Sequence, residues 1–194
     1  MPIYQDQLHQ TLSIASPPQR IISLVPSQTE LLHYWGLGER VVGITKFCIH
    51  PEVWYRGKTR VGGTKTVDMK KVAALAPDLI IGNKEENSQG DIEHLQGKYP
   101  VWMSDIYTLE DAYAMMEQLG ELLGVADKAA ALVTQLRQDM ALLKARPISN
   151  KRVAYFIWRK PWMIAARHTF IDHLLSLAGF ENVFGGQELS LIHI

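Results

Sequence analysis

Two side chains that could bind a metal, Cys48 and His50, lie in the segment FCIH. Thiolate and imidazole are good ligands for zinc, iron or cobalt. A zinc site needs three or four ligands, and the sequence has no HExxH, CxxC or paired HxxxH motif to supply the others. We therefore expect Cys48 to be a small buried apolar residue, and we favour this interpretation over a role as a metal ligand. His50 stays a candidate axial ligand to a chelated metal.

Two adjacent carboxylates, Glu85 and Glu86, lie in the polar segment NKEEN. Such a pair can act as a general acid and base, but the sequence pairs no nucleophile with them. The GLG at 36–38 precedes a predicted strand and does not open a helix, so it does not form a phosphate-binding loop. A cytoplasmic enzyme that modifies a cofactor with Cys48, His50 and Glu86 stays an alternative, although the residue pattern favours binding over catalysis.

The elements that position these residues follow a strand, turn and helix pattern. Ile21, Ile22, Leu24 and Val25 form a short run that is apolar on both faces, which is typical of a parallel strand buried under helices. The chain then turns at Pro26, and Ser27 to Glu30 match the SxxE capping box that predicts the start of a helix. Ligands bind at the carboxyl ends of parallel strands, where a helix N-terminus offers free amide groups. The turn at Pro26 and Ser27 is thus a candidate wall of a binding site.

The same pattern repeats along the first half of the chain and predicts a parallel sheet wrapped by helices, that is, an α/β fold. A second strand is expected at 41–45, followed by a long aromatic loop at 46–63. The further predicted elements are a helix capped by Asp68 and ending at Ala76, a strand at 78–82 that opens into Asn83–Asn87, a helix at 88–98, a strand at 101–104 and a helix capped by Thr108 and ended by Gly124.

From Ala126 to Arg146 the sequence predicts one helix of about 30 Å at 1.5 Å per residue. It contains no glycine or proline, so it is expected to be stiff. Two strands are expected around Arg159 to Pro161, followed by a capped helix that starts at TFIDHLL and ends at Gly179. These elements predict the beginning of a second α/β lobe.

Composition excludes several classes of function. The chain has 20 basic and 20 acidic residues, which disfavours binding to nucleic acid or an anionic membrane. Its single cysteine excludes an intrachain disulfide. No apolar run approaches the roughly 20 residues that span a bilayer. The first 20 residues lack the basic and apolar regions of a secretory signal, so either the protein stays inside the cell or an upstream segment is missing.

Several segments together resemble the helical-backbone (class III) periplasmic substrate-binding proteins of ABC importers, in the cobalamin and iron-chelate branch. The matching segments are RIISLVPSQTE, VVGIT followed by HP, RVGG, VAALAPDLIIG, VWMSD before TLED, KRV, and AGFENVF. The resemblance implies two Rossmann-like α/β lobes with parallel sheets joined by one long rigid helix, and only small closure on ligand binding. The implied boundaries are 1–124, 125–147 for the bridging helix and 148–194 for the second lobe.

The resemblance also implies a function: non-catalytic capture of a cobalamin-like or iron-chelate ligand, haem or a siderophore, between the lobes for delivery to an importer permease. No intrinsic cofactor is implied. A flat corrin or porphyrin needs stacked rings and a few polar groups, which Phe47, Trp54, Tyr55, Trp158 and Trp162 could supply, with Trp54 and Tyr55 equally expected in the core. The expected ligand contacts are Pro26, Ser27, Phe47, Cys48, His50, Asn83, Glu85, Glu86, Trp158 and Trp162. A solvated turn is the alternative for 83–87, and a free zinc or manganese receptor is the alternative function.

Three features depart from the family pattern. The absent signal contrasts with the periplasmic or cell-envelope location that the resemblance implies, and the location is cytoplasmic if the N-terminus is complete. Lys70 stands where the cobalamin receptors carry a glutamate that docks on transporter arginines. The chain ends at GGQELSLIHI, where the family continues, so the second lobe is expected to be truncated and Leu189 to Ile194 to be non-native. A truncated lobe would leave apolar faces uncovered and favour association.

Overall fold

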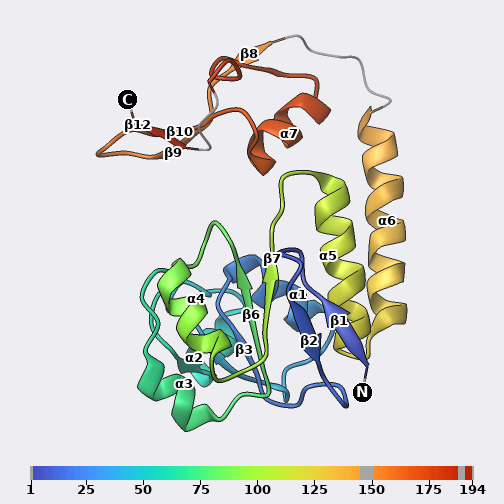
Figure 1. The fold of residues 1–194 in the computed structure, drawn as a ribbon. Helices are drawn as coiled ribbons and strands as arrows, with labels where there is room; N and C mark the ends of the chain where they lie inside the picture. Colours follow the sequence, from blue (N-terminus) through green and yellow to red (C-terminus); the bar gives the residue numbers. More distant parts are fainter. Residues whose placement is uncertain (1, 145–150, 188–190, 194) are drawn as a thin grey trace. The chain divides into compact units, whose positions relative to one another are not determined.

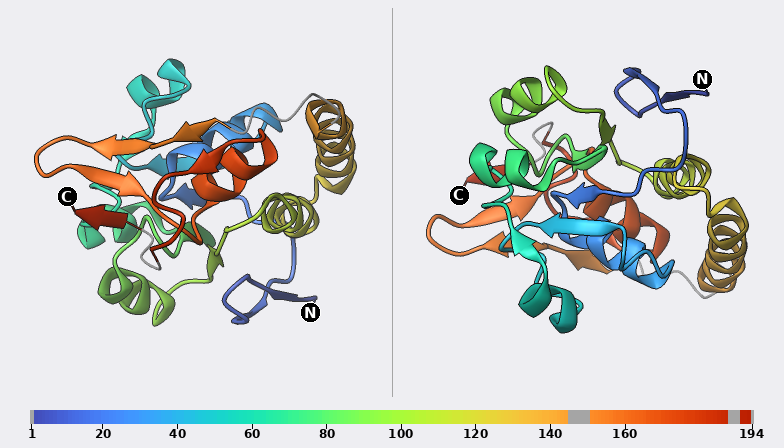
Figure 2. Two further views of the ribbon diagram at one scale, coloured as in Figure 1. Left: turned by 90° about the horizontal axis from the view of Figure 1, so that it is seen from above. Right: turned by 90° about the horizontal axis from the view of Figure 1, so that it is seen from below.

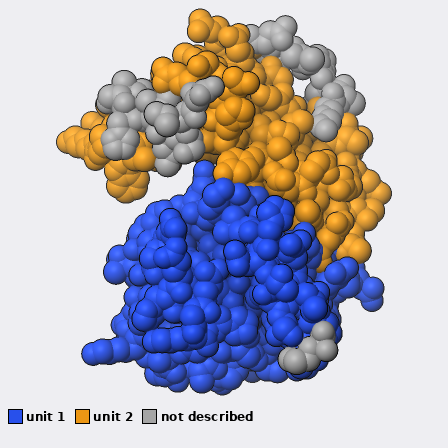
Figure 3. All heavy atoms as spheres, in the orientation of Figure 1, with its two compact units in different colours: residues 1–105, 118–129 blue, residues 106–117, 130–194 orange. Residues whose placement is uncertain are grey.

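A computed structural model describes residues 2–144, 151–187 and 191–193 of the 194-residue chain. The chain divides into two compact units, coloured separately in Figure 3. The first unit contains Met1–Asp105 and Gln118–Ala129, and the second contains Ile106–Glu117 and Ala130–Ile194. Two of the three boundaries, at 117/118 and 129/130, fall within helices, because α5 (Leu109–Leu122) and α6 (Ala126–Lys144) each contribute residues to both units.

The first unit is built on a five-stranded parallel sheet (Figure 1) with the strand order β5-β4-β3-β6-β7. The strands are β3 (Ile21–Ser23), β4 (Val41–Ile44), β5 (Thr59–Arg60), β6 (Leu79–Asn83) and β7 (Val101–Ser104). Ile21 lies opposite both Val41 and Leu79, so β3 is central. Its three residues are buried, as expected for a parallel strand covered on both faces. The predicted α/β fold with a buried parallel sheet is confirmed.

Helices cover both faces of this sheet. The view from below in Figure 2 shows α1 (Pro26–Tyr34) on one face and α3 (Met69–Leu75) and α4 (Gln89–Gln96) on the other. A core of buried aliphatic side chains lies under α3 and α4, and includes Ile22, Leu24, Val72, Ile80, Ile92 and Leu95. The segment 118–129 packs on the side of the sheet that α1 covers. There Lys128 Nζ donates a 2.6 Å hydrogen bond to the carbonyl oxygen of Trp35.

An N-terminal hairpin, β1 (Ile3–Gln5) and β2 (Thr11–Ser13), is attached to the sheet through Asp6. The buried Asp6 carboxylate accepts hydrogen bonds from the amides of Leu8, Gln10 and Met103 at 2.7–3.2 Å. Burial raises the pKa of Asp6, and the three amides oppose that shift. A side chain that closes the hairpin turn therefore also fixes the hairpin to β7.

Two local predictions in the first unit are wrong. Helix α1 begins one residue before the predicted capping box: Val25 is its N-cap, Pro26 occupies the first turn, and no side chain caps it. Proline suits this position because its φ is already helical and its missing N–H would be unpaired there. The predicted loop at 46–63 contains a short helix, α2 (Glu52–Gly57), and the edge strand β5.

Four predicted helix starts agree with the structure. The side chains of Asp68, Ser88 and Thr169 accept hydrogen bonds from the third residue after them and cap α3, α4 and α7 (Phe170–Leu177). Thr108 caps α5 in the same way, through the amide of Asp111. A side-chain oxygen that accepts such an amide satisfies one of the unpaired donors of a helix N-terminus.

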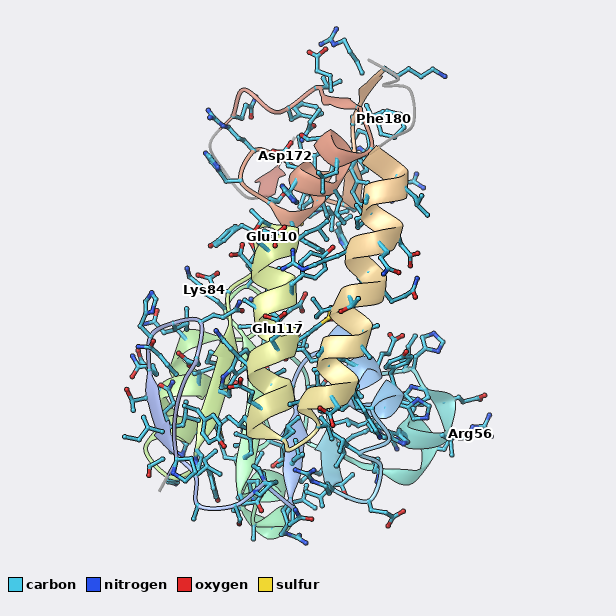
Figure 4. All side chains as sticks on the ribbon, turned by 90° about the vertical axis from the view of Figure 1, so that its right-hand side faces the viewer. Arg56, Lys84, Glu110, Glu117, Asp172 and Phe180 are labelled. Atoms are coloured by element: carbon cyan, nitrogen blue, oxygen red, sulfur yellow. The ribbon has the colours of Figure 1, made fainter. Side chains whose placement is uncertain are left out.

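The helices α5 and α6 pack closely where Gly120 meets Ala129, since a Cβ at Gly120 would lie 2.4 Å from the Ala129 Cβ. Glu110 and Glu117 both lie on α5 (Figure 4), and Glu110 accepts a 2.8 Å ion-pair contact from Arg137 of α6. The predicted long helix is confirmed from Ala126 to Lys144, while its last two predicted residues, 145 and 146, lie outside the described residues. No described helix is both long and apolar enough to cross a membrane.

The second unit contains two small sheets. Strands β9 (Phe156–Trp158), β10 (Met163–Ala165) and β12 (Leu191–His193) form an antiparallel sheet. Strands β8 (Arg152–Val153) and β11 (Glu181–Asn182) form a parallel pair, with α7 between β10 and β11 in sequence. The two strands predicted around Arg159 to Pro161 are thus confirmed as β9 and β10. Residues 188–190 and 194, in and beside the predicted non-native tail, lie outside the described residues.

Candidate ligand-binding site

The candidate site of the first unit is the edge of the sheet at which its parallel strands end. Parallel strands finish on the same side, and in open α/β sheets ligands bind there. Five loops leave this edge, at 24–25 after β3, 45–51 after β4, 61–68 after β5, 84–88 after β6 and 105–108 after β7. Most of the residues predicted to contact a ligand fall on these loops or on the helices that follow them.

Beneath the edge lies a buried cluster of hydroxyl groups around the only thiol. The Cys48 Sγ atom is 3.2 Å from the Oγ1 atoms of both Thr29 and Thr45, and Thr29 Oγ1 also donates to Ser23 Oγ at 2.8 Å. Cys48 is fully buried, as the sequence favoured. Among the described residues no group of three His, Cys, Asp or Glu side chains could hold a metal ion. The buried contacts of Cys48 with Thr29 and Thr45 thus connect the loop after β4 to α1.

The first turn of α1 forms one wall of the edge. Ser27 is exposed, and Pro26 is half-buried beside it. Behind them Gln28 is buried, and its Nε2 donates a 2.5 Å hydrogen bond to Ser104 Oγ at the end of β7. This bond ties α1 to a strand two positions away in the sheet, so the Pro26–Ser27 turn is held in place.

The loop after β4 presents an aromatic ring and an imidazole. Phe47 is 52% exposed and His50 is also exposed. The Lys46 Nζ atom lies 5.1 Å from the centre of the Phe47 ring, which is within range of a cation–π contact. An exposed phenyl ring and an imidazole on one loop are suited to a ligand with a flat apolar face and a metal centre.

The loop after β6 is organised by Asn83. Its Oδ1 accepts hydrogen bonds from the amides of Glu85 and Glu86 at 2.9 and 3.1 Å, and its Nδ2 donates to Ser104 Oγ at 3.0 Å. Asn83 therefore shapes the turn that carries the two carboxylates. Both glutamates are exposed, so this loop is also compatible with the alternative of a solvated turn.

The charges around Glu85 have a defined pattern. Although Glu85 is exposed as a residue, the protein atoms packed around its carboxyl group and the neighbouring carboxylates of Asp105 and Glu86 raise its pKa, while Lys65 and Lys84 oppose the shift. Lys84 (labelled in Figure 4) forms a 2.6 Å ion pair with Asp105, the residue after β7. Lys65 Nζ donates to the backbone oxygen of Glu85. Three carboxylates and two lysines thus lie close together around this loop.

Within the second unit, Trp158 and Trp162 flank the turn between β9 and β10. They are 62% and 47% exposed. The Trp162 ring meets Phe156 edge to face, with 5.4 Å between centroids, and the Arg159 guanidinium lies 5.7 Å from its centre. This unit therefore carries an exposed aromatic surface of its own.

Trp54 and Tyr55, which the sequence predicted equally as ligand contacts or as core residues, differ in burial. Trp54 is buried on α2, where its ring contacts His33 edge to face at 5.1 Å. Tyr55 is half-buried, with the Arg60 guanidinium 5.0 Å from its ring centre. Trp54 belongs to the core.

Sequence reasoning missed four residues of this edge, Lys46, Gly63, Thr64 and Asp105, and it named Asn87 only as part of the polar segment 83–87. The Asn87 side chain is buried, accepts the Asn83 amide at 2.8 Å and donates to the Thr64 oxygen at 3.0 Å. The paired glycines of RVGG after a strand could have signalled a close backbone approach. No sequence pattern distinguishes Asn87 from its polar neighbours.

Comparison with protein families settles the class of the chain. A model of the family described as periplasmic binding protein matches residues 21–191. The chain belongs to this family. Periplasmic binding proteins capture solutes and are not enzymes, so the expectation of a binding protein is confirmed.

Individual relatives of this periplasmic binding protein are a vitamin B12-binding protein and an ABC transporter substrate-binding lipoprotein. It is 28% identical over 187 residues to the vitamin B12-binding protein of Vibrio parahaemolyticus. This alignment covers 94% of this chain and 67% of that protein. It is 29% identical over 192 residues to the ABC transporter substrate-binding lipoprotein YvrC of Bacillus subtilis. This alignment covers 94% of this chain and 60% of YvrC. The chain thus spans between three-fifths and two-thirds of the length of these two relatives.

Solved structures have the same fold. The vitamin B12-binding protein BtuF of Vibrio cholerae matches with a TM-score of 0.80 and 29% identity, covering 92% of this chain and 71% of that one. A haem-binding protein of Pseudomonas aeruginosa matches with a TM-score of 0.80 and 25% identity, covering 91% and 66%. The predicted family and fold are therefore confirmed.

Proposed function

We propose that this chain captures a cobalamin-like or iron-chelate ligand, such as haem or a ferric siderophore, for an ABC importer. The observation that carries the proposal is the loop after β4, which exposes Phe47 and His50 at the carboxyl edge of a parallel sheet. Such an edge is where α/β proteins bind ligands. The relatives that bind vitamin B12 or haem support the same class of ligand.

The side chains on this edge suit the chemistry of a flat metal chelate. A corrin or porphyrin ring buries a large apolar face, for which a half-exposed phenyl ring is a suitable partner. His50 can supply a nitrogen to the chelated metal, as histidine does in many haem proteins. Ser27, Glu85 and Glu86 offer polar groups for the ring substituents. Pro26, Cys48, Asn83, Trp158 and Trp162 stay predicted contacts.

The partner in this proposal is the permease of an ABC importer, and the location is the cell envelope. The family and the lipoprotein relative support both. Lys70 is exposed on α3, so docking of that helix on the permease would use a basic side chain. The bridging role of 125–147 between lobes 1–124 and 148–194 is part of the same proposal.

An absorbance titration of the 194-residue chain with cyanocobalamin, hemin and a ferric hydroxamate tests this function. We expect saturable spectral change with one of them. Phe47→Ala should weaken binding about tenfold, equivalent to about 1.4 kcal/mol, through lost ring contact. With hemin, whose iron has an axial position open to an imidazole, His50→Ala should change the visible spectrum of the bound chelate, because that axial ligand is lost.

Tyr34→Ala is the matched control, since Tyr34 is 67% exposed at the end of α1 and thus at the opposite edge of the sheet. Its affinity should equal that of the parent chain. Absence of saturable binding to all three chelates would overturn the proposal. Stoichiometric binding of zinc or manganese in their place would favour the free-metal receptor.

A further inference from the structure

Gly63 lies close to the side chains of Lys46 and Phe47, which form a cation–π pair in the candidate site. A Cβ built on Gly63 would lie 3.3 Å from Lys46 Cε and 3.3 Å from Phe47 Cε2. These separations are tighter than ordinary van der Waals contacts between carbons, which are about 3.5–4.0 Å. Glycine therefore lets the Phe47 ring and the Lys46 stem lie against the backbone of the loop after β5.

The need for glycine at this position is spatial. Gly63 does not adopt a left-handed φ, whereas its neighbour Gly62 has φ +106°. Alanine at Gly62 would also meet the Thr66 oxygen at 2.5 Å, so that position is fixed by the backbone itself. Alanine at Gly63 meets only the far parts of two side chains closely, which can move without unfolding the loop.

The backbone around Gly63 is held by hydrogen bonds on both sides. The Lys46 amide donates to the Gly62 oxygen at 2.8 Å, and the Gly63 amide donates to the Thr66 oxygen at 2.8 Å. Asn87 donates to the Thr64 oxygen at 3.0 Å from the loop after β6. Since the loop is fixed, a side chain added at Gly63 must displace Phe47 and Lys46.

The displaced groups are linked to each other, because the Lys46 ammonium lies 5.1 Å from the centre of the Phe47 ring. Movement of the ring by a few tenths of an ångström would change how closely a flat ligand can stack on it. Stacking and dispersion both fall steeply with separation.

We propose that Gly63 is a positioning residue that sets the height of the Phe47 ring above the sheet edge and so limits how deeply a flat chelate can seat. The inference rests on the proposed function, since it takes Phe47 as a ligand contact. It predicts that Gly63 acts on affinity only through Phe47 and its Lys46 neighbour.

A double-mutant cycle in binding affinity tests this. The probe is whichever of cyanocobalamin, hemin and the ferric hydroxamate the parent chain binds. Gly63→Ala should weaken binding about fivefold, equivalent to about 1 kcal/mol. In a Phe47→Ala background the same change should have little effect, because coupled residues are non-additive. Gly57→Ala is the matched control, since a Cβ there meets nothing within 4 Å, and it should bind as the parent does.

A second measurement needs no ligand. The chain has five phenylalanines, so fluorine NMR of fluorophenylalanine-labelled protein gives five signals, and Phe47→Ala identifies one of them. Gly63→Ala should shift the Phe47 signal, while Gly57→Ala should not. An unmoved signal, or an equal loss of affinity with and without Phe47, would overturn the role of Gly63 while leaving the proposed function intact. A parent chain that binds none of the three chelates would overturn both.

Discussion

The Nδ2 atom of Asn87 donates a 3.0 Å hydrogen bond to the carbonyl oxygen of Thr64, 23 residues earlier in the chain. Both residues are buried. The Oδ1 atom of the same side chain accepts from the Asn83 amide at 2.8 Å. One side chain thus joins the loop after β5, which carries Gly63, to the loop after β6, which carries Glu85 and Glu86.

Asn87→Ala should therefore destabilise the chain. It would leave the Asn83 amide and the Thr64 oxygen without their partners, and an unsatisfied buried group costs about 1–3 kcal/mol. Urea unfolding followed by circular dichroism measures the change. Gln89→Ala, an exposed position on α4, is the control and should change the free energy of unfolding by less than about 0.5 kcal/mol. Equal stability of the Asn87 variant and the parent would mean that water replaces both bonds.

The cap of α5 predicts a pH dependence. Partial burial opposes ionisation of Asp111, but hydrogen bonds from the Thr108 hydroxyl and the amides of Tyr107 and Thr108 prevail and lower its pKa from the usual value of an aspartate. A lowered pKa in the folded state gives a stabilisation that is present above the unfolded pKa and is lost as the pH falls through the folded one. Asp111→Asn should therefore cost about 1 kcal/mol at pH 7, and the difference from the parent should shrink below pH 4.

Chemical denaturation of both proteins between pH 7 and pH 3 checks this dependence. Thr108→Ser serves as the control, because it keeps the hydroxyl that accepts from the Asp111 amide at 3.2 Å. A difference between Asp111→Asn and the parent that stays constant over this range would contradict the role of the ionised carboxylate.

Two glycines in helices should respond to alanine with opposite signs. Gly120→Ala should destabilise by about 1–3 kcal/mol, since the new Cβ would lie 2.4 Å from Ala129 Cβ where α5 meets α6. Gly90→Ala on α4 meets nothing within 4 Å and should stabilise by up to about 1 kcal/mol through helix propensity. Thermal unfolding of the two variants measures both. A gain in stability for Gly120→Ala would show that α5 and α6 can separate at little cost.

Cys48 should be protected from thiol reagents in the folded chain. It is fully buried beside Thr29 and Thr45, and it is the only cysteine, so any reaction reports on it alone. Ellman's reagent should react at the rate at which the chain opens and rapidly in urea. Immediate reaction without denaturant would contradict this prediction and show that the thiol is accessible at the surface.

The sheet and most helix starts could be predicted because their signals are local. Apolar runs at 21–25 and 41–45 specify buried parallel strands, and Asp68 and Thr108 carry the side-chain oxygens that cap helices. The capping box at Ser27 misled because the sequence fits the motif while Pro26, one residue earlier, already has helical φ. Helix α2, with six residues, is too short to show a periodic pattern.

The location of the candidate site could be predicted from the sequence, but the roles of its residues could be predicted only in part. The carboxyl ends of predicted parallel strands put Ser27, Phe47 and Glu85 on one edge. The roles of Asn83 and Asn87 depend on contacts between segments that are far apart in sequence, and no local pattern carries that information. The paired glycines of RVGG indicate a close approach at Gly63 but not which side chains it meets. Asn83, predicted as a ligand contact, uses its side chain within the loop.

The division of α5 and α6 between the two units has a consequence for any attempt to dissect the protein. Neither unit is a contiguous stretch of sequence, because the first needs Gln118–Ala129 in addition to Met1–Asp105. Leu119, Leu122 and Ala129 are buried, so a fragment that stops at 105 would lack part of its interior. Chimaeras between relatives should therefore exchange both helices together with a unit, and splice points within α5 or α6 should give insoluble protein.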